Sequence, residues 1–253
     1  MEEPVVVFIS GVSKGLGKEL ARVYLSRPNH IVVGSIRDTF ATDVADLKSM
    51  KSAEGSRILL VSIENTSIDD PAKALDDIKA AGIGHLDIVI ANAGGGGDDP
   101  KVSLETIDMK EMTTRFQSNA LGPLLLYQTF RPLLQKSRRT PKWISMSTAG
   151  GSIELIGATR ATMLPAYSAS KAALNWLTRA IHFNNDWLIA IAMHPGLVQT
   201  GPGNWFAGHL GLEKAPLTID FCVEKMVDVI DHATREETSG KFISAIEGTE
   251  LPW

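Results

Sequence analysis

The feature that most restricts the fold of this chain is a series of short apolar runs, rich in β-branched residues, separated by longer amphipathic stretches. The first run is Val5 to Ile9. Strands that are apolar at every position are buried on both faces, as in parallel sheets covered by helices. The runs predict strands at residues 5–9, 30–36, 57–63, 86–91, 143–147, 188–194 and 241–244. The amphipathic stretches predict helices at residues 15–27, 42–51, 69–80, 104–136 (as two helices, the second broken near Gly122-Pro123), 167–183 and 218–232.

The predicted strands and helices alternate along all 253 residues, and no repeat, low-complexity segment or flexible linker divides them. With 44% apolar and 21% charged residues, the chain has enough apolar side chains for one large core. We therefore expect a single domain over residues 1–253 with an α/β fold, a Rossmann-type doubly wound parallel sheet of about seven strands with helices on both faces. In such a sheet, ligands bind beyond the carboxyl ends of the strands.

Charge and targeting signals exclude several classes of protein. Lys and Arg total 25 and Asp and Glu total 29, and this net charge of −4 argues against a nucleic-acid partner. The apolar run 188–193 is six residues long, whereas a membrane helix needs roughly 20. The acidic start of the chain does not resemble a signal peptide, and the single cysteine, Cys222, suits a reducing compartment. We expect a cytoplasmic protein that binds neither membranes nor nucleic acids.

A glycine-rich turn follows the first predicted strand directly and leads into a helix. Its glycines, Gly11, Gly15 and Gly17, have the spacing G-x-x-x-G-x-G. Glycines let the backbone turn tightly and approach a pyrophosphate at the positive end of the helix. A plain tight turn is the alternative, but the position between a strand and a helix favours a phosphate-binding loop.

A second glycine-rich motif, Asn92-Ala93-Gly94, ends the fourth predicted strand and continues into glycines 95–97. It is either a structural turn or a wall of a cofactor site. Because the carboxyl ends of parallel strands share one edge of the sheet, this motif is expected beside the first glycine loop, which favours the cofactor wall.

A tyrosine and a lysine lie four residues apart near the start of the predicted helix 167–183. Tyr167 and Lys171 therefore share one face of that helix. An ammonium close to a phenol favours the phenolate and lowers the pKa of the phenol, which suits proton transfer near neutral pH. By itself, Tyr-x-x-x-Lys occurs by chance in many helices, so the pair gains its meaning from the other motifs.

In this order, the motifs resemble those of the short-chain dehydrogenase/reductase family. The resemblance spans nearly the whole chain and includes a Pro-Gly pair after the sixth predicted strand. Within the family, the sequence is most similar to Sniffer-type carbonyl reductases and fungal norsolorinic acid ketoreductases. The similar segments are 92–94, 168–175, 194–200 and 247–253.

The resemblance implies a role for each catalytic residue. Tyr167 would give its proton to a carbonyl oxygen while hydride reaches the carbon. Lys171 would lower the pKa of Tyr167 and hold the nicotinamide ribose, and Asn119 would position a water that passes protons to Lys171. A Ser or Thr hydroxyl after the fifth strand would hydrogen-bond the substrate oxygen.

Two neighbouring residues compete for the last of these roles. Family members usually carry two serines here, and the second is the catalytic one. Counting from Ile144, or back from the segment 151–153, places Thr148 at that position, whereas counting back from Gly150 selects Ser147. We expect Thr148 to bind the substrate oxygen, with Ser147 as the alternative.

The resemblance also implies that the cofactor is NADP(H). A ribose 2′-hydroxyl needs a carboxylate at the end of the second strand, whereas a 2′-phosphate needs cations and tolerates no acid there. Ile36 takes the usual place of the acid, with Asp38 two residues on, while Arg37 and Lys14 match family positions that contact the 2′-phosphate. The residues expected at the cofactor are Gly11, Ser13, Lys14, Gly15, Leu16, Gly17, Arg37, Ile63, Asn92, Ala93, Gly94, Tyr167, Lys171, Pro195, Gly196, Val198 and Thr200.

The sequence departs from the family in two places. Ser62 stands where many members have an Asp that contacts adenine, so this contact is expected to be weaker or to come from the backbone near Ile63. The stretch before Tyr167 is longer than usual, and we expect substrate loops at about 152–166 and 201–216. In the second loop, the candidates for a substrate contact are Trp205, Phe206 and His209.

We expect an enzyme that reduces a ketone or aldehyde with NADPH, with an aromatic polyketide intermediate as one possible class of substrate, and that forms a homo-oligomer, either a dimer or a tetramer. The alternatives are an alcohol dehydrogenase working in the oxidative direction and a catalytically silent dinucleotide-binding sensor or scaffold. The presence of Tyr167, Lys171 and Asn119 disfavours the silent protein. The six histidines lack metal-ligand spacing, so no metal site is expected.

Overall fold

The computed structural model describes residues 3–38, 44–95 and 102–253. In this part of the chain, seven parallel strands form one sheet in the order β3-β2-β1-β4-β5-β6-β7. The strands are β1 (Val5–Ser10), β2 (His30–Ile36), β3 (Arg57–Ser62), β4 (Ile88–Ala91), β5 (Lys142–Met146), β6 (Ile189–His194) and β7 (Phe242–Ser244). Every predicted strand is present, and the predicted doubly wound Rossmann-type sheet is confirmed.

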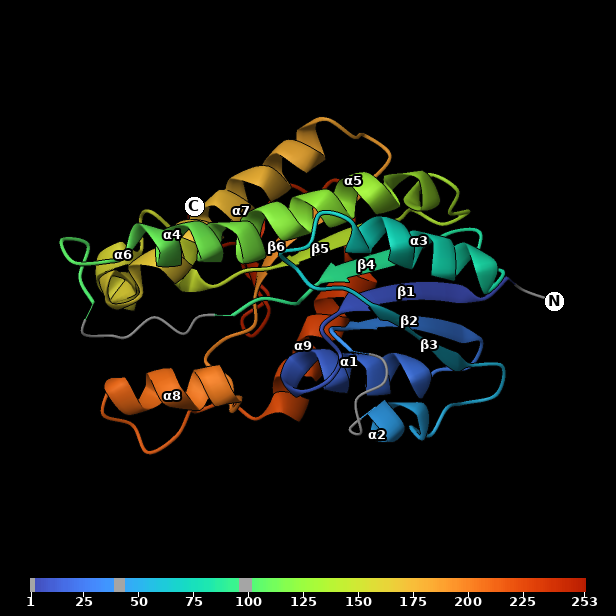
Figure 1. Ribbon diagram of the computed structural model, residues 1–253, viewed down its shortest axis with the longest axis horizontal. Coiled ribbons are helices and arrows are strands. Elements are labelled where there is room, and N and C mark those ends of the chain that lie inside the picture. Colours follow the sequence, from blue (N-terminus) through green and yellow to red (C-terminus); the bar gives the residue numbers. More distant parts are fainter. Residues whose placement is uncertain (1–2, 39–43, 96–101) are drawn as a thin grey trace.

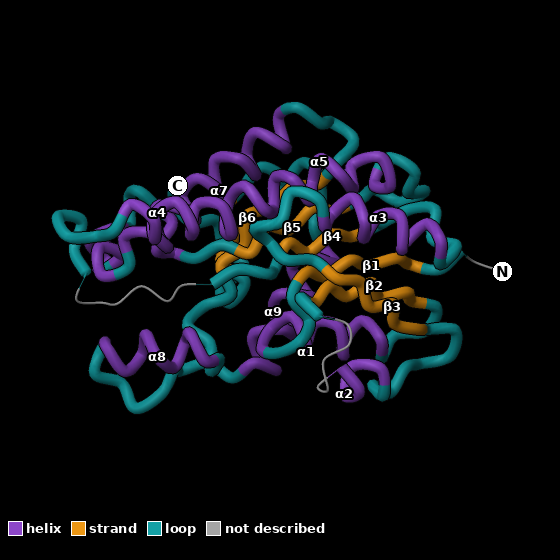
Figure 2. Tube along the Cα trace, in the orientation of Figure 1, coloured by secondary structure: helices purple, strands orange, loops and turns teal. Residues whose placement is uncertain are grey.

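Helices cover both faces of the sheet. Figure 1 shows α1, α2 and α9 on one side and α3, α5 and α7 on the other, and Figure 2 shows the strands as a single layer between them. The helices are α1 (Gly15–Leu25), α2 (Val44–Lys48), α3 (Asp70–Ala80), α4 (Met109–Phe116), α5 (Gly122–Leu134), α6 (Ile156–Thr159), α7 (Pro165–Phe183), α8 (Gly201–His209) and α9 (Ile219–His232). Three short turns complete the described structure: the π-turn η1 (Gln117–Leu121) and the 3₁₀ turns η2 (Ala149–Gly151) and η3 (Ala161–Met163).

The apolar run of β1 shows why a central parallel strand lacks polar positions. Its side chains alternate between two separate cores, because successive residues of a strand point to opposite faces. Val7 and Ile9 pack in the core beneath α1 and α9, whereas Val6 and Phe8 pack in the core beneath α3 and α5. Phe8 meets Phe130 of α5 edge to face, with ring centroids 4.7 Å apart. Both faces of β1 are therefore buried, as the sequence predicts.

The strand order reverses at β1, and this places the functional edge of the sheet. The chain moves from β1 outward to β2 and β3, then returns to β4 on the opposite side of β1. Loops that leave neighbouring strands in opposite directions open a crevice at the carboxyl ends. The glycine loop follows β1 and the motif 92–94 follows β4, so both border this crevice.

Two helical predictions need correction. The predicted break near Gly122-Pro123 is not an interruption: α4, the π-turn η1 and α5 run without a gap from Met109 to Leu134. The Gly122 N–H donates to the Gln117 carbonyl, five residues back, and Pro123 stands at the start of α5, where its missing N–H costs little. The predicted helix 42–51 is shorter: α2 covers residues 44–48, and residues 42–43 lie outside the described part. Helices α6 and α8 occupy segments where only loops were predicted.

Candidate active site

The glycine loop between β1 and α1 forms an open cradle at a helix N-terminus. Gly11 and Gly15 have φ values of +74° and +59°, which residues other than glycine rarely adopt. A Cβ on Gly17 would lie 2.2 Å from the Gly11 oxygen, so only glycine lets the loop fold this closely onto α1. Lys14 precedes α1 without a side-chain cap on the first N–H groups of the helix. These N–H groups are donors that suit a phosphate.

Two cations flank this cradle at the carboxyl ends of β1 and β2. Lys14 and Arg37 are both exposed, and Ile36, which ends β2, is buried. Ser62 stands where many family members have an Asp. Its Oγ donates a 2.8 Å hydrogen bond to the Arg37 carbonyl. Ile63 is tied to the same strand end through a 2.9 Å bond from its N–H to the Ile36 carbonyl. Arg37, Ser62 and Ile63, which are predicted near the adenosine half of a cofactor, thus lie together.

The motif after β4 is fastened to the glycine loop, as its predicted position requires. Asn92 Nδ2 donates to the Ser10 carbonyl at 2.9 Å and to the Gly11 carbonyl at 3.3 Å. The Ala93 N–H also donates to this loop, to Ser10 Oγ at 2.8 Å. The motif is therefore a wall of the cradle. Of the glycines that follow it, Gly96 and Gly97 lie outside the described residues.

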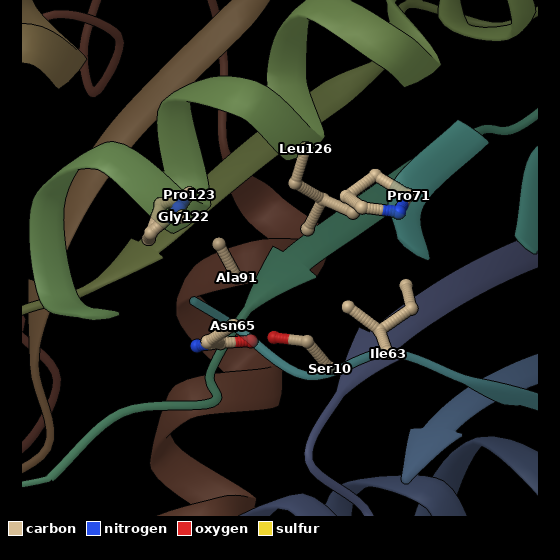
Figure 3. A pocket seen from close by; sticks show the side chains of 8 residues that line it. All are labelled: Ser10, Ile63, Asn65, Pro71, Ala91, Gly122, Pro123 and Leu126. Carbon is tan, nitrogen blue, oxygen red and sulfur yellow. The ribbon is translucent and has the colours of Figure 1, made fainter. Parts of the chain in front are cut away.

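Sequence reasoning missed Asn65, which binds the other side of this wall. Asn65 Nδ2 donates to the Ala93 carbonyl at 2.9 Å and to the Ser118 carbonyl at 3.3 Å, so it links the wall to the π-turn η1. Figure 3 shows Asn65 beside a small cavity that Ser10 and Ala91 also line. Asn65 follows β3 at the carboxyl edge of the sheet, and that position was the only signal in the sequence that pointed to it.

Asn119 lies in the π-turn and fixes the far end of the wall. Its side chain is fully buried. Nδ2 donates to the Gly95 carbonyl at 3.1 Å and to Ser170 Oγ at 3.0 Å, while Oδ1 accepts from the Gly95 N–H at 3.1 Å. A Cβ on Gly94 would lie 2.8 Å from Asn119 Oδ1 and 3.6 Å from Lys171 Nζ. Asn119, Gly94 and Lys171 therefore meet at one point.

Lys171 and Tyr167 share the face of α7 that turns toward this point. Lys171 is buried, and its Nζ donates a 2.6 Å hydrogen bond to the Met146 carbonyl at the end of β5. Nζ lies 5.8 Å from the centroid of the Tyr167 ring. Burial lowers the pKa of Lys171 to about 8, because the low-dielectric surroundings disfavour the ammonium. At pH 7 the lysine still carries most of its charge beside the phenol.

The two hydroxyls that follow β5 have different surroundings. Ser147 is buried, and its Oγ donates a 2.6 Å bond to Asn175 Oδ1 on α7. Thr148 is half-buried and extended, and its Oγ1 accepts a long, 3.3 Å bond from the Gly150 N–H. Successive residues of an extended chain point in opposite directions. Within the described residues, the Ser147 proton is already donated, while no donation from Thr148 is seen.

The segment after β6 returns to the glycine loop. It turns at Gly196, with φ +88°, and Val198 forms a parallel bridge with Leu217. Thr200 caps α8 through a 3.2 Å bond from the Gly203 N–H to its Oγ1. A Cβ on Gly15 would lie 3.5 Å from Thr200 Cγ2, so this segment packs against the phosphate cradle. The predicted nicotinamide side of the site thus joins the predicted phosphate side.

His194 at the end of β6 has an unusual environment. Its Nδ1 is buried without a hydrogen-bond partner among the described residues. Burial lowers the pKa of His194 to about 4, so the imidazole is neutral at pH 7. This desolvated ring stands directly before the segment 195–200.

The three aromatic candidates of the second loop all lie on α8. Trp205 packs on His209 with ring centroids 4.5 Å apart, and His209 Nδ1 lies 2.8 Å from the Trp205 carbonyl. Figure 1 shows α8 at the same end of the molecule as α6. No contact between Trp205, Phe206 or His209 and the proposed catalytic side chains is seen in the described part of the chain.

The described residues contain no group of three or more His, Cys, Asp or Glu side chains placed to hold a metal ion. Their helices are all too short or too polar to cross a membrane.

Together, the sheet, the glycine cradle and the Tyr-Lys pair define a dinucleotide-binding oxidoreductase. The sequence model of the family described as short chain dehydrogenase matches residues 5–204. The chain therefore belongs to the short-chain dehydrogenase/reductase family, and the enzyme class predicted from the sequence is confirmed.

Named relatives and solved structures agree with this assignment. A short-chain dehydrogenase of Neurospora crassa is 51% identical and covers 99% of this chain and 98% of its own. A norsolorinic acid ketoreductase of Aspergillus parasiticus is 33% identical, with 99% and 92% covered. The NADPH-bound carbonyl reductase from chicken fatty liver superimposes with a TM-score of 0.86 at 25% identity, with 100% of both chains covered. The carbonyl reductase Sniffer of D. melanogaster gives 0.82 at 26% identity, with 99% and 100% covered.

Proposed function

We propose that this protein reduces a ketone or aldehyde to an alcohol with NADPH as the hydride donor. The observation that carries the proposal is the buried Lys171 ammonium, 5.8 Å from the Tyr167 ring, on the helix face that borders the glycine cradle. A carbonyl needs both a hydride and a proton to become an alcohol, and this pair is suited to provide the proton. The relatives named norsolorinic acid ketoreductases and the carbonyl reductase structures support a carbonyl substrate.

In this proposal, each side chain has a defined task. Tyr167 gives its phenolic proton to the carbonyl oxygen, and the Lys171 ammonium lowers the pKa of the phenol so that the transfer proceeds near neutral pH. The Thr148 hydroxyl hydrogen-bonds the same oxygen and stabilises the negative charge that develops there. The bound cofactor supplies the hydride.

Asn119 supports these groups indirectly. All three of its amide hydrogen bonds hold Gly95 and Ser170, next to Lys171. We assign it the task of fixing the cofactor wall against the catalytic lysine. The water-positioning role that the family resemblance implies for Asn119 stays a prediction.

The residues present fit NADP(H). The uncapped N–H groups at the start of α1 and the close approach at Gly17 suit a pyrophosphate. Lys14 and Arg37 would hold the 2′-phosphate, and the apolar Ile36 places no carboxylate at the end of β2. The NADPH in the chicken carbonyl reductase, a structural neighbour of this chain, supports the same cofactor here.

Cofactor titration tests this part directly. NADPH is expected to bind at least tenfold more tightly than NADH, a difference of about 1.4 kcal/mol. Protein fluorescence measured against each reduced cofactor gives both dissociation constants. An Arg37→Ala variant should lose much of this preference, because its 2′-phosphate contact is gone, while its affinity for NADH stays the same. Equal affinities for NADPH and NADH in the unaltered protein would reject the assignment.

The finer predictions from the sequence stay proposals. They are a ketone of the aromatic polyketide class as the substrate, the loops 152–166 and 201–216 as the walls of its pocket, a homo-oligomeric assembly and a cytoplasmic location.

A further inference from the structure

The last residues of the sequence fold back along β7 in an ordered arrangement. The Leu251 N–H donates to the Phe242 carbonyl at 2.7 Å, and Glu250 forms an antiparallel bridge with Ile243. Lys241 and Glu250 form an ion pair at 3.6 Å. Residues 249–253, here called the return segment, are therefore held as an additional edge on the sheet. None of them takes part in the chemistry proposed above.

Trp253 in the return segment reaches across to α7. Its ring stacks on Phe242, with centroids 5.7 Å apart and an interplanar angle of 28°. The Arg179 guanidinium carbon of α7 lies 5.1 Å from the ring centroid of Trp253, a cation–π contact. Figure 1 also shows the end of the chain beside α7. The ring is thus fixed on two sides by β7 and α7.

The backbone of Trp253 contacts the first predicted substrate loop. The Glu154 N–H donates a 3.1 Å hydrogen bond to the Trp253 backbone oxygen. This loop begins just after the 3₁₀ turn that Thr148 caps and ends at α7, two residues before Tyr167. The loop is therefore joined to both proposed catalytic hydroxyls. It also lies close to Thr148, since a Cβ on Gly150 would be 3.8 Å from both Ala161 Cβ and Thr148 Cγ2.

Among the described residues, the other hydrogen bonds of the loop stay within it or join it to η2 and to the start of α7. The Leu155 N–H donates to Ser152 Oγ at 3.1 Å, and Ser168 Oγ donates to the Ala161 carbonyl at 3.1 Å. Ile153 and Ile156 are 72% and 41% exposed. Glu154, which donates to Trp253, lies between these two apolar residues, so its bond joins them to the return segment.

We propose that Trp253 is a positioning residue for substrate binding, which fixes residues 153–156 of the loop so that Ile153 and Ile156 border the apolar part of the carbonyl substrate. The claim that Ile153 and Ile156 border the substrate rests on the proposed function. The mechanical part of the proposal, that Trp253 orders residues 153–156, rests only on the contacts described above. The two parts can therefore be tested separately.

Hydrogen exchange tests the mechanical part without any substrate. Trp253→Ala removes the stacking on Phe242 and Arg179, and the amides of residues 153–156 should then exchange roughly tenfold faster. Trp253→Phe keeps an aromatic ring there and should exchange like the unaltered protein. Trp187→Ala is the matched control, because it also removes an indole that contacts an arginine. The Arg131 guanidinium carbon lies 5.6 Å from the ring centroid of Trp187. It should leave exchange in residues 153–156 unchanged.

Steady-state kinetics with an apolar ketone test the substrate part. In Trp253→Ala, KM for the ketone should rise about fivefold while the dissociation constant of NADPH changes less than about twofold. Trp253→Phe should restore KM. A merely structural role would instead lower the active fraction, and so the apparent kcat, with KM unchanged.

Three results would overturn the proposal: unchanged exchange at 153–156 in Trp253→Ala, equally fast exchange in Trp187→Ala, or unchanged KM despite faster exchange. If the unaltered protein reduces no ketone, the proposed function fails instead, and the exchange experiment still decides whether Trp253 orders the loop.

Discussion

At the scale of single residues, the two hydroxyls after β5 differ in whether the hydroxyl proton is already donated in a hydrogen bond. Ser147 gives its proton to Asn175 in a buried bond, whereas Thr148 is half-buried with a long bond from Gly150. We predict that Thr148→Val lowers kcat/KM at least tenfold more than Ser147→Ala, because a hydroxyl at the substrate oxygen acts on the transition state. Valine keeps the shape of threonine, so steady-state kinetics of the two variants isolate the hydroxyl.

Stability provides the control for this comparison. Ser147→Ala leaves Asn175 Oδ1 buried without its donor and should reduce the free energy of unfolding by about 1 kcal/mol. Thr148→Val should unfold close to the unaltered protein. A larger loss of kcat/KM at Ser147, in protein that is still folded, would assign the catalytic role to Ser147.

His194 leads to a prediction about stability in acid. Its folded pKa is about 4, below the ordinary value of 6.5, because burial disfavours the imidazolium. Between these two values the unfolded chain binds the proton and the folded chain does not, so stability is fully present above pH 6.5 and falls toward pH 4. The loss from this residue between pH 7 and pH 4 should be about 3 kcal/mol, because each pKa unit corresponds to about 1.4 kcal/mol.

Urea unfolding measured from pH 7 to pH 4 checks this value. A His194→Asn variant, which has no titrating ring, should lose less stability over the same range. If both proteins lose the same amount, His194 is not the group responsible.

The proposed catalytic and cofactor residues could be identified from the sequence to the extent that they stand in local motifs. Gly11, Gly17, Tyr167 and Lys171 carry recognisable spacing, and the fold brings them to one edge of the sheet, as the prediction required. Asn65 has no such spacing. Its function comes from contacts with the Ala93 and Ser118 carbonyls, which are distant in sequence, and so only the three-dimensional structure reveals it.

At the scale of elements, the strands were predicted well because burial on both faces requires apolar residues throughout. The helical region 109–134 was predicted less well. Glycine and proline together suggest a break, yet a π-turn absorbs them and keeps the helix continuous. In this turn, Asn119 bonds to Gly95 and Ser118 accepts from Asn65. These are tertiary contacts that periodicity does not contain. Helix α6 has only one turn, which is too short to show a helical repeat of apolar residues in the sequence.

Gly122, between the π-turn and α5, should tolerate no side chain. A Cβ there would lie 2.5 Å from the Asn65 carbonyl oxygen. We predict that Gly122→Ala displaces the turn 64–67, reduces the free energy of unfolding by about 1 to 3 kcal/mol and weakens NADPH binding, because the wall at Ala93 loosens. Urea unfolding and NADPH titration measure both effects.

The control for this substitution is Gly157→Ala in α6, where a Cβ would meet nothing within 4 Å. It should be neutral or slightly stabilising, since alanine favours helix. Similar losses in the two variants would show that the contact with Asn65 is not the cause.

At the scale of the whole molecule, the parallel sheet is what assembles the site. Apart from Asn119 in the π-turn, the segments proposed to act follow the carboxyl end of a strand or begin a helix beside it, so residues from 11 to 200 meet along one edge. The opposite edge, where Arg138 pairs with Glu3 at 3.3 Å, carries no proposed chemistry. The substrate is not predictable from this architecture, because the fold is shared by many activities and the pocket loops set the choice.

The most direct test of the account is the loss of NADPH absorbance when the protein meets a panel of ketones, measured in parallel for Tyr167→Phe. The unaltered protein should oxidise NADPH only when a ketone is present and produce one alcohol for each NADPH consumed. Tyr167→Phe should bind NADPH with similar affinity while kcat falls by roughly 10² or more, since the ring remains and the proton donor is gone. Ketone reduction at a near-normal rate by Tyr167→Phe would contradict the account.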